Sequence, residues 1–182
     1  MRIVAGEFKG RRLKSPTWDG LRPTSDRLRE TLFNILGGAV AGARVLDGYA
    51  GTGAIGIEAL SRGAAEVTFV EQDRRAIRLI EANLGLLRQP DLTASDPRRR
   101  DAIIRTGFAA LEGDPFDVIV LDPPYGPGAA DEALGRAAGL LAPGGRLVVE
   151  HAARHAAPAG HGSLRLLRTV KAGDSALSFY GF

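Results

Sequence analysis

The residues best suited to chemistry form the segment Asp122-Pro123-Pro124-Tyr125, which directly follows the apolar run 118–121. Such a run predicts a buried parallel strand, and the prolines end it because neither donates a hydrogen bond to a sheet. The strand therefore delivers a carboxylate, rigid carbonyls and an aromatic ring to the carboxyl edge of the sheet, where ligands bind in open α/β proteins. Two acceptors and a stacking face suit an exocyclic amine on a nucleobase. We predict that this segment is catalytic.

A second candidate site is the glycine-rich segment that follows a predicted strand at 43–47. Its glycines permit a tight turn and close approach of a ligand to the backbone, and the helix that follows offers unpaired N–H groups. A further predicted strand, 66–70, ends at a carboxylate that can accept hydrogen bonds from ribose hydroxyls. These features predict a nucleotide-type cofactor, bound by Asp47, Ala50, Gly51, Gly53 and Glu71.

Two cofactors fit this glycine pattern. Gly51-x-Gly53-x-x-Gly56 satisfies the dinucleotide fingerprint, and Glu71 stands where an NAD-binding acid would. Asp47 favours S-adenosylmethionine, because it precedes the glycines at the strand end and can face a cationic amino group. An enzyme that uses nicotinamide has no evident role for Asp-Pro-Pro-Tyr. We therefore predict S-adenosylmethionine, with an NAD-dependent dehydrogenase as the alternative.

The composition bounds the class of protein. The chain has 182 residues, of which 45% are hydrophobic, and we expect a single domain over 1–182. Cysteine is absent, which excludes disulfides, thiolate-held clusters and methylation through a cysteine adduct. No segment resembles a membrane span or a signal peptide, so we expect a cytoplasmic protein without a membrane partner. No metal is expected, because three histidines without ligand spacing are predicted to lie on the surface: His151, His155 and His161.

Positive charge gathers at the start of the chain, although the net charge is only +3. Residues 1–23 are predicted to form a basic hairpin and loop, an N-terminal extension within the single domain. A basic arm of this kind indicates a polyanion partner. The candidate contacts are Lys9, Arg11, Arg12, Arg22 and Arg27.

The predicted elements alternate between strand and helix, which implies an α/β fold with a parallel sheet covered by helices. Helices are predicted at 26–36, 73–87 and 131–142. An antiparallel hairpin around Gly173-Asp174 ends the chain. We expect a mostly parallel seven-stranded sheet with an antiparallel last strand, formed by 43–47, 66–70, 102–105, 117–121, 146–150, 164–171 and 176–182.

The N-terminal region carries the pattern Arg2-Ile3-x-x-Gly6-x-x-Lys9-Gly10-Arg11-x-Leu13, then Arg22-Pro23-Thr24-Ser25-Asp26-Arg27. With the glycine-rich loop, Asp122–Tyr125 and Ser178-Phe179-Tyr180 in the same order, it resembles the RsmD family of bacterial 16S ribosomal RNA guanine-N2 methyltransferases. The resemblance covers nearly the whole chain. It implies a Rossmann-like, class I S-adenosylmethionine-dependent methyltransferase fold.

The resemblance also implies an activity, namely methyl transfer to the N2 amine of a specific guanine in 16S rRNA. The partner would be this rRNA or the small ribosomal subunit, and the enzyme would be a monomer. The Asp122 carboxylate and the Pro123 carbonyl would accept hydrogen bonds from the amine, Tyr125 would stack on the base, and the basic extension would bind RNA.

Two positions depart from the family pattern. Gly48 stands where a bulky apolar residue is usual, which predicts a looser loop. Thr106 stands near the usual position of an Asp or Asn that meets the adenine amine. We therefore expect backbone groups of Thr106 and Gly107 to contact the adenine. The basic loop 88–100 has no predicted role.

Two further functions stay open. A DNA adenine-N6 methyltransferase shares Asp-Pro-Pro-Tyr, but this chain has no inserted target-recognition domain. A non-catalytic RNA-binding assembly factor is the other alternative.

Overall fold

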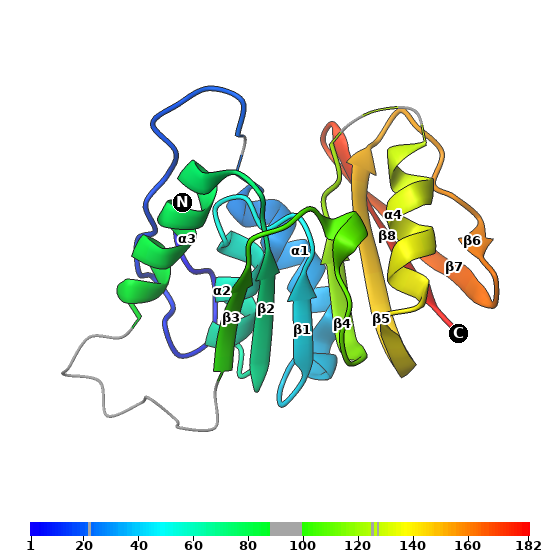
Figure 1. The fold of residues 1–182 in the computed structure, drawn as a ribbon, viewed down its shortest axis with the longest axis horizontal. Helices are drawn as coiled ribbons and strands as arrows, with labels where there is room; N and C mark the ends of the chain where they lie inside the picture. The colour runs from blue at the N-terminus through cyan, green and yellow to red at the C-terminus, as the bar shows by residue number, and fades with distance from the viewer. Residues whose placement is uncertain (22, 88–99, 125, 127) are drawn as a thin grey trace.

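One mixed sheet runs through the described part of the chain, with its strands in the order β3-β2-β1-β4-β5-β8-β7-β6. The structure is a computed structural model that describes residues 1–21, 23–87, 100–124, 126 and 128–182. Neighbouring strands from β3 to β5 are parallel, and the pairs from β5 to β6 are antiparallel (Figure 1). The strands are β1 (Arg44–Asp47), β2 (Glu66–Val70), β3 (Arg100–Ile104), β4 (Phe116–Leu121), β5 (Leu141–Ala152), β6 (Gly160–His161), β7 (Leu164–Ala172) and β8 (Ser175–Gly181).

The predicted class of fold is confirmed, but the predicted strand number is wrong. The described sheet has eight strands because the two-residue β6 pairs with the first residues of β7. A strand this short has no periodicity of its own, so only its long-range partner defines it. β5 is also longer than the predicted strand 146–150, since it includes the segment around Pro143 and continues to Ala152.

Helices cover both faces of the sheet. They are α1 (Asp26–Leu36), α2 (Ala54–Ser61), α3 (Arg74–Gly85) and α4 (Ala129–Ala138), with short 3-10 helices η1 (Gly37–Ala39) and η2 (Phe108–Ala110). Along β4, Val118 and Val120 pack in one core cluster with α1 and α2, while Ile119 and Leu121 pack in the other with α4. This alternation explains the continuous apolar run, because a strand buried on both faces needs apolar residues at every position.

The N-terminal segment, predicted to form a hairpin and loop, packs against α1 and α2. Its hairpin has a single antiparallel bridge, between Arg2 and Arg12. Ile3, Phe8 and Leu13 are buried in the core cluster that also holds α1 and α2. The apolar residues between the cations therefore anchor the segment in the core. The sequence prediction for this segment is based on its cations and does not include these apolar contacts.

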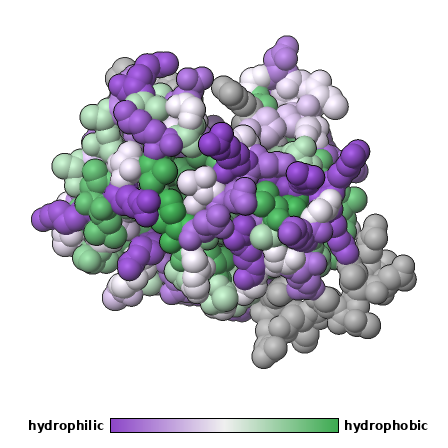
Figure 2. Space-filling view, turned by 180° about the vertical axis from the view of Figure 1, so that it is seen from behind, coloured by the Kyte–Doolittle hydropathy of each residue, from purple (hydrophilic) through white to green (hydrophobic). Residues whose placement is uncertain are grey.

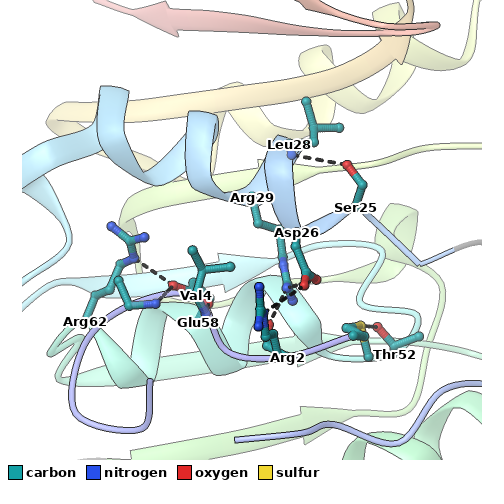
Figure 3. A network of polar contacts seen from close by, with 11 residues as sticks. Arg2, Val4, Ser25, Asp26, Leu28, Arg29, Thr52, Glu58 and Arg62 are labelled. Atoms are coloured by element: carbon teal, nitrogen blue, oxygen red, sulfur yellow. Dashed lines mark hydrogen bonds and ion pairs between the residues drawn. The ribbon is translucent and has the colours of Figure 1, made fainter. Parts of the chain in front are cut away.

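Glu58 of α2 fixes the backbone of this segment (Figure 3). Its fully buried carboxylate accepts hydrogen bonds from Val4 N at 2.8 Å and Ala5 N at 2.9 Å. Arg62 Nε donates a third, also at 2.9 Å. A buried carboxylate is tolerated only where donors compensate its lost hydration. Because the donors come from the N-terminal backbone, α2 and this segment stabilise each other.

Among the described residues, no helix has both the length and the apolar character that a membrane crossing requires.

Candidate functional site

The candidate site lies at the carboxyl edge of the parallel strands, where each of four neighbouring strands carries an acid at or near its end. In the order β2-β1-β4-β5, these strand ends carry Glu71, Asp47, Asp122 and Glu150. The register fixes their proximity, since Asp47 pairs with Val120 and Leu121 pairs with Val149. The parallel topology thus gathers at one edge four carboxylates that are far apart in the sequence.

Asp47 is buried at 2% exposure, and its Oδ2 accepts a hydrogen bond from Gly56 N of α2 at 2.9 Å. Burial raises the pKa of Asp47 to about 7, although the Gly56 hydrogen bond opposes the rise and the Glu71 charge adds to it. An acid held this way would gain from a cationic ligand, which favours the ionised form. The predicted contact with a cationic amino group is consistent with this environment and stays a prediction.

The glycine loop turns sharply between β1 and α2. Gly51 and Gly53 have φ angles of +53° and +76°, a region that L side chains rarely adopt. The loop is closed by a hydrogen bond of 2.7 Å from Gly53 N to the Ala50 carbonyl. The sequence-predicted glycines therefore occupy positions that favour glycine, and both are buried in the turn.

Glu71 holds this loop against the end of β2. Its Oε2 accepts from Gly51 N at 2.9 Å, and its Oε1 accepts from Gln72 N and Asp73 N at 2.8 Å. The structure thus gives Glu71 a role in shaping the loop that the sequence did not indicate. Its predicted ribose contact would be made by the same carboxylate.

Asn83 of α3 ties the N-terminal segment to the glycine loop, a connection that sequence reasoning missed. Its side chain is fully buried and donates to the carbonyls of Thr52 at 3.1 Å and Lys14 at 3.2 Å. Its Oδ1 accepts from Lys14 N at 2.8 Å. A Cβ on Gly51 would lie 3.1 Å from Leu21 Cδ1, so the same segment also flanks the loop.

The predicted looseness at Gly48 is wrong. A Cβ there would lie only 2.3 Å from Leu121 Cδ2 and 3.2 Å from the Phe108 ring. Gly48 N also donates to the Val120 carbonyl at 2.9 Å. The close approach of Leu121 and Phe108 leaves no room for a larger residue, so this part of the loop is tightly packed.

Thr106 and Gly107 follow β3 at the same edge of the sheet, and both are half-buried. A Cβ on Gly107 would lie 3.3 Å from Gln72 Oε1, which places this turn beside the end of β2. The structure thus brings the predicted adenine-contacting backbone next to the segment that contains Glu71. The adenine contact itself stays a prediction.

Asp122 is half-buried, Pro123 is buried and Pro124 is exposed. Burial raises the pKa of Asp122 to about 8, and the charges of Glu150 and Asp47 add to the rise. No hydrogen bond to this carboxylate comes from the part of the chain that the structure describes. Asp122 therefore keeps its acceptor capacity for a ligand. The predicted stacking residue, Tyr125, lies outside the described residues.

A pocket of about 290 Å³ adjoins this segment, a size near the lower end for small-ligand sites. Its walls are Pro123 and Pro124, the start of α4, the last residues of β5 and the loop 155–158. Within this wall, Glu150 is 5% exposed. Sequence reasoning missed Glu150, although it follows an apolar strand just as Asp122 does.

The prediction that His151 lies on the surface is wrong. It is 6% exposed, because β5 continues through it and pairs it with Ala176 of β8. Its Nδ1 lies 3.1 Å from the Ala152 carbonyl and its Nε2 lies 2.8 Å from Ser178 Oγ. A carbonyl can only accept, so Nδ1 donates to the Ala152 carbonyl, and Nε2 and Ser178 Oγ form the second hydrogen bond of the ring. Ser178 Oγ in turn lies 2.9 Å from Thr169 Oγ1.

The predicted polyanion contacts differ in their surroundings. Lys9, Arg12 and Arg27 are exposed. Figure 2 views the molecule from behind and shows hydrophilic side chains spread among apolar ones over that face. Arg11 is half-buried and donates through Nη1 to the Leu86 carbonyl at 2.8 Å, so it also has a structural role. Arg22 and the loop 88–99 lie outside the described residues.

Solved structures show the class of protein to which this fold belongs. The Escherichia coli protein yhhF matches with a TM-score of 0.82 and 34% identity, over 99% of this chain and 96% of that one. The Haemophilus influenzae protein HI0767 matches with a TM-score of 0.76 and 30% identity, over 98% and 96% of the two chains. The fold is that of the class I methyltransferases.

The particular family follows from the sequence relatives. A family model described as Conserved hypothetical protein 95 matches residues 1–181, and the chain belongs to this family, the RsmD family that its motifs resemble. Ribosomal RNA small subunit methyltransferase D of Escherichia coli (strain K12) is 35% identical over 182 residues, covering 99% of this chain and 89% of that protein. The protein of the same name from Haemophilus influenzae (strain ATCC 51907 / DSM 11121 / KW20 / Rd) is 38% identical over 138 residues, covering 74% and 68%.

Proposed function

We propose that this protein transfers a methyl group from S-adenosylmethionine to the exocyclic N2 amine of a guanine in 16S rRNA of the small ribosomal subunit. The observation that carries the proposal is the position of Asp122. It is a strand-end carboxylate with no donor among the described residues, beside a pocket and one strand away from the glycine loop. The full-length relative from Escherichia coli, by name a small-subunit rRNA methyltransferase, supports this choice of substrate.

The residues of the glycine loop fit the cofactor. The left-handed glycines form a tight turn without side chains that would block a nucleoside, and the buried Asp47 carboxylate suits the amino group of a methionine moiety. When bound, S-adenosylmethionine supplies a methyl group on an electron-poor sulfonium. The residues that would hold it are Asp47, Ala50, Gly51, Gly53, Glu71, Thr106 and Gly107.

The catalytic segment would act by positioning and by accepting hydrogen bonds. The lone pair of guanine N2 is delocalised into the ring, so the amine is a weak nucleophile. The Asp122 carboxylate and the Pro123 carbonyl would each accept one N–H, which localises the lone pair and directs it in line with the methyl group. Tyr125 would stack on the base, a contact worth about 1–3 kcal/mol.

The raised pKa of Asp122 also suits it as a proton acceptor near neutral pH, once the amine has been methylated. Positive charge on the cofactor would favour the ionised carboxylate before the reaction. Asp122 would therefore accept hydrogen bonds as an anion and take up the proton that the product amine releases.

An rRNA substrate places the reaction in the cytoplasm, and a single domain acting as a monomer suffices for it. The exposed cations Lys9, Arg12 and Arg27 would contact RNA phosphates, together with Arg11 and Arg22. A target base in paired RNA would have to be flipped out to reach the pocket beside Asp122.

The proposal is tested by mass spectrometry of rRNA nucleosides from the source bacterium and from a strain that lacks this gene. We expect one N2-methylguanosine of 16S rRNA to disappear and to return with the wild-type gene, but not with Asp122→Ala. Unchanged rRNA would support the assembly factor, and a loss of N6-methyladenine from DNA would support the DNA methyltransferase.

A further inference from the structure

The wall of the pocket beside Asp122 contains a buried carboxylate, Glu150 of β5. It is 5% exposed and lines the pocket together with Pro123 and Pro124. The register places it one residue beyond Val149, which pairs with Leu121 of β4. Glu150 and Asp122 thus follow paired positions on adjacent parallel strands.

We propose that Glu150 determines the specificity of the site by accepting the N1–H of the target guanine, while Asp122 and Pro123 accept from the N2 amine. This inference rests on the proposed function and names a residue that would read the base as well as present it.

The hydrogen-bonding edge of guanine explains why two carboxylates would be needed. Guanine presents N1–H and the N2 amine side by side, and both are donors. Adenine has an acceptor at N1, which a carboxylate would repel. A buried carboxylate opposite N1 therefore favours guanine over adenine, because it attracts the N1–H of guanine and repels the N1 lone pair of adenine.

Other polar residues of the pocket wall are less suited to this role. Both ring nitrogens of His151 are already used, since Nδ1 donates to the Ala152 carbonyl and Nε2 contacts Ser178. Asp131 lines the pocket from the first turn of α4, but its side chain is exposed. Water therefore competes for Asp131, whereas burial makes a hydrogen bond to Glu150 more selective.

The position of Glu150 is also well fixed. β4 flanks its strand on one side, and Glu150 itself pairs with Leu177 of β8 on the other. The adjacent His151 ring is held by Ser178. A carboxylate on a strand anchored from both sides keeps its place relative to Asp122, as a specificity contact requires.

Electrostatics point in the same direction. Burial and the charge of Glu150 both raise the pKa of Asp122, so the two acids repel each other in the absence of a ligand. A guanine edge brings one N–H donor to each of these acids, the N1–H to Glu150 and one N2–H to Asp122. Binding of guanine would relieve this repulsion, whereas a base with an acceptor at N1 would not.

The test uses 16S rRNA that carries either guanine or 2-aminopurine at the methylated position. 2-Aminopurine keeps the N2 amine but has an acceptor at N1. Methyl transfer by wild type, Glu150→Gln and Asp131→Asn is measured as kcat/KM on both RNAs. We expect wild type to prefer guanine on the order of 100-fold. Glu150→Gln should reduce this ratio to below about tenfold, because an amide can donate to N1 of 2-aminopurine.

Asp131→Asn is the matched control, since it removes a carboxylate from the same pocket wall and should keep the wild-type ratio. 2-Aminopurine also lacks O6, so the decisive quantity is the change in ratio between wild type and Glu150→Gln. An equal loss on both RNAs, with the ratio unchanged, would reduce Glu150 to a structural residue and overturn the inference.

A second measurement needs only the wild-type protein. RNA with inosine at the position keeps N1–H but lacks the amine, so it should inhibit competitively, although it binds less tightly than the guanine RNA because Asp122 and the Pro123 carbonyl lose their donors. 2-Aminopurine RNA should compete much more weakly, and equal competition by the two would contradict the inference. If wild type fails to methylate the guanine RNA at N2, the proposed function itself is wrong.

Discussion

The sheet edge has two halves, which we call the cofactor half (Glu71 and Asp47, at β2 and β1) and the acceptor half (Asp122 and Glu150, at β4 and β5). Their carboxylates differ in what they contact. On the cofactor half, Asp47 accepts from Gly56 N, and Glu71 accepts from three backbone N–H groups, including that of Gly51. On the acceptor half, Asp122 accepts no hydrogen bond from the described residues and adjoins a pocket. The first pair shapes the loop that would bind the cofactor, and Asp122 is left to bind a substrate.

The comparison shows that burial alone does not separate the two roles. Burial raises the pKa of both Asp47 and Asp122, to about 7 and about 8. Their hydrogen-bond partners separate them, because Asp47 already accepts from the backbone of α2, whereas Asp122 keeps its acceptor capacity for a ligand. Variants on the two halves should therefore affect different measured quantities.

The largest effect is expected for Asp122→Ala. Losing one preorganised partner of the reacting group typically lowers turnover on the order of 100–1000-fold. The affinity for S-adenosylhomocysteine should stay near that of wild type, because the cofactor half is untouched. Turnover by steady-state methyl transfer and affinity by calorimetry are measured together. Activity within about threefold of wild type would remove Asp122 from the mechanism.

Glu71→Ala should give the opposite pattern. It removes the acceptor of Gly51 N and the predicted ribose contact, so we expect the cofactor Kd to rise at least about tenfold, as for loss of a hydrogen bond to a charged group. Turnover at saturating cofactor should change little. Glu71→Gln retains one acceptor oxygen and serves as the milder control. A variant with normal Kd and reduced turnover would show that the two halves are not separable.

Cofactor affinity should increase with pH up to about 7, the raised pKa of Asp47. A cationic ligand binds the ionised acid, so binding releases a proton, and affinity changes by up to about tenfold per pH unit below the pKa. The stability of the free protein should change in the opposite direction. The raised pKa of Asp47 means that the folded protein holds this proton more tightly than the unfolded chain does. The contribution of Asp47 to the free energy of unfolding therefore falls as pH rises from about 4 to about 7.

Asp47→Asn is the control for this pH dependence, because the amide oxygen can still accept from Gly56 N but does not titrate. Calorimetry at pH 6, 7 and 8 should show a flatter profile for the variant. An equally steep profile in wild type and Asp47→Asn would assign the dependence to another group.

The smallest effect is expected at the N-terminal segment, which shares residues with neither half of the edge. Replacing the exposed Lys9 and Arg12 with Ala should weaken RNA binding. It should also flatten the slope of log affinity against log salt concentration by up to about two, one per lost phosphate contact. Cofactor affinity should not change. Arg11 is retained because it bonds to the Leu86 carbonyl.

A charge-matched control for this variant replaces Arg168 and Lys171, which are exposed on β7. It should leave the salt slope at the wild-type value. Equal slopes for the Lys9/Arg12 variant and this control would show that the N-terminal cations only cover a packed surface.

The sequence predicts the strand ends that carry Asp47, Glu71 and Asp122 because each depends on a local pattern. An apolar run followed by Asp47, Glu71 or Asp122 marks a strand end, and parallel topology places all such ends at one edge. The observed strands β1, β2 and β4 agree with those predictions to within one residue at each end.

The remaining features depend on contacts between distant segments. β5 continues through Glu150 and His151 because β8 pairs with it, and no local pattern announces that pairing. In the sequence, Glu58 resembles an ordinary polar residue of a helix. In the structure it is fully buried, and its carboxylate accepts hydrogen bonds from Val4 N and Ala5 N. The close packing at Gly48 likewise depends on side chains about 60–70 residues away, beyond the reach of local propensity.

The most direct test of the central claim is to identify the atom that receives the methyl group. Purified protein is incubated with small ribosomal subunits from the deletion strain and S-adenosylmethionine carrying a deuterated methyl group, and the nucleosides are analysed by mass spectrometry. We predict one labelled N2-methylguanosine with wild type and none with Asp122→Ala. Label on another base or another atom, or equal labelling by the two proteins, would contradict the account.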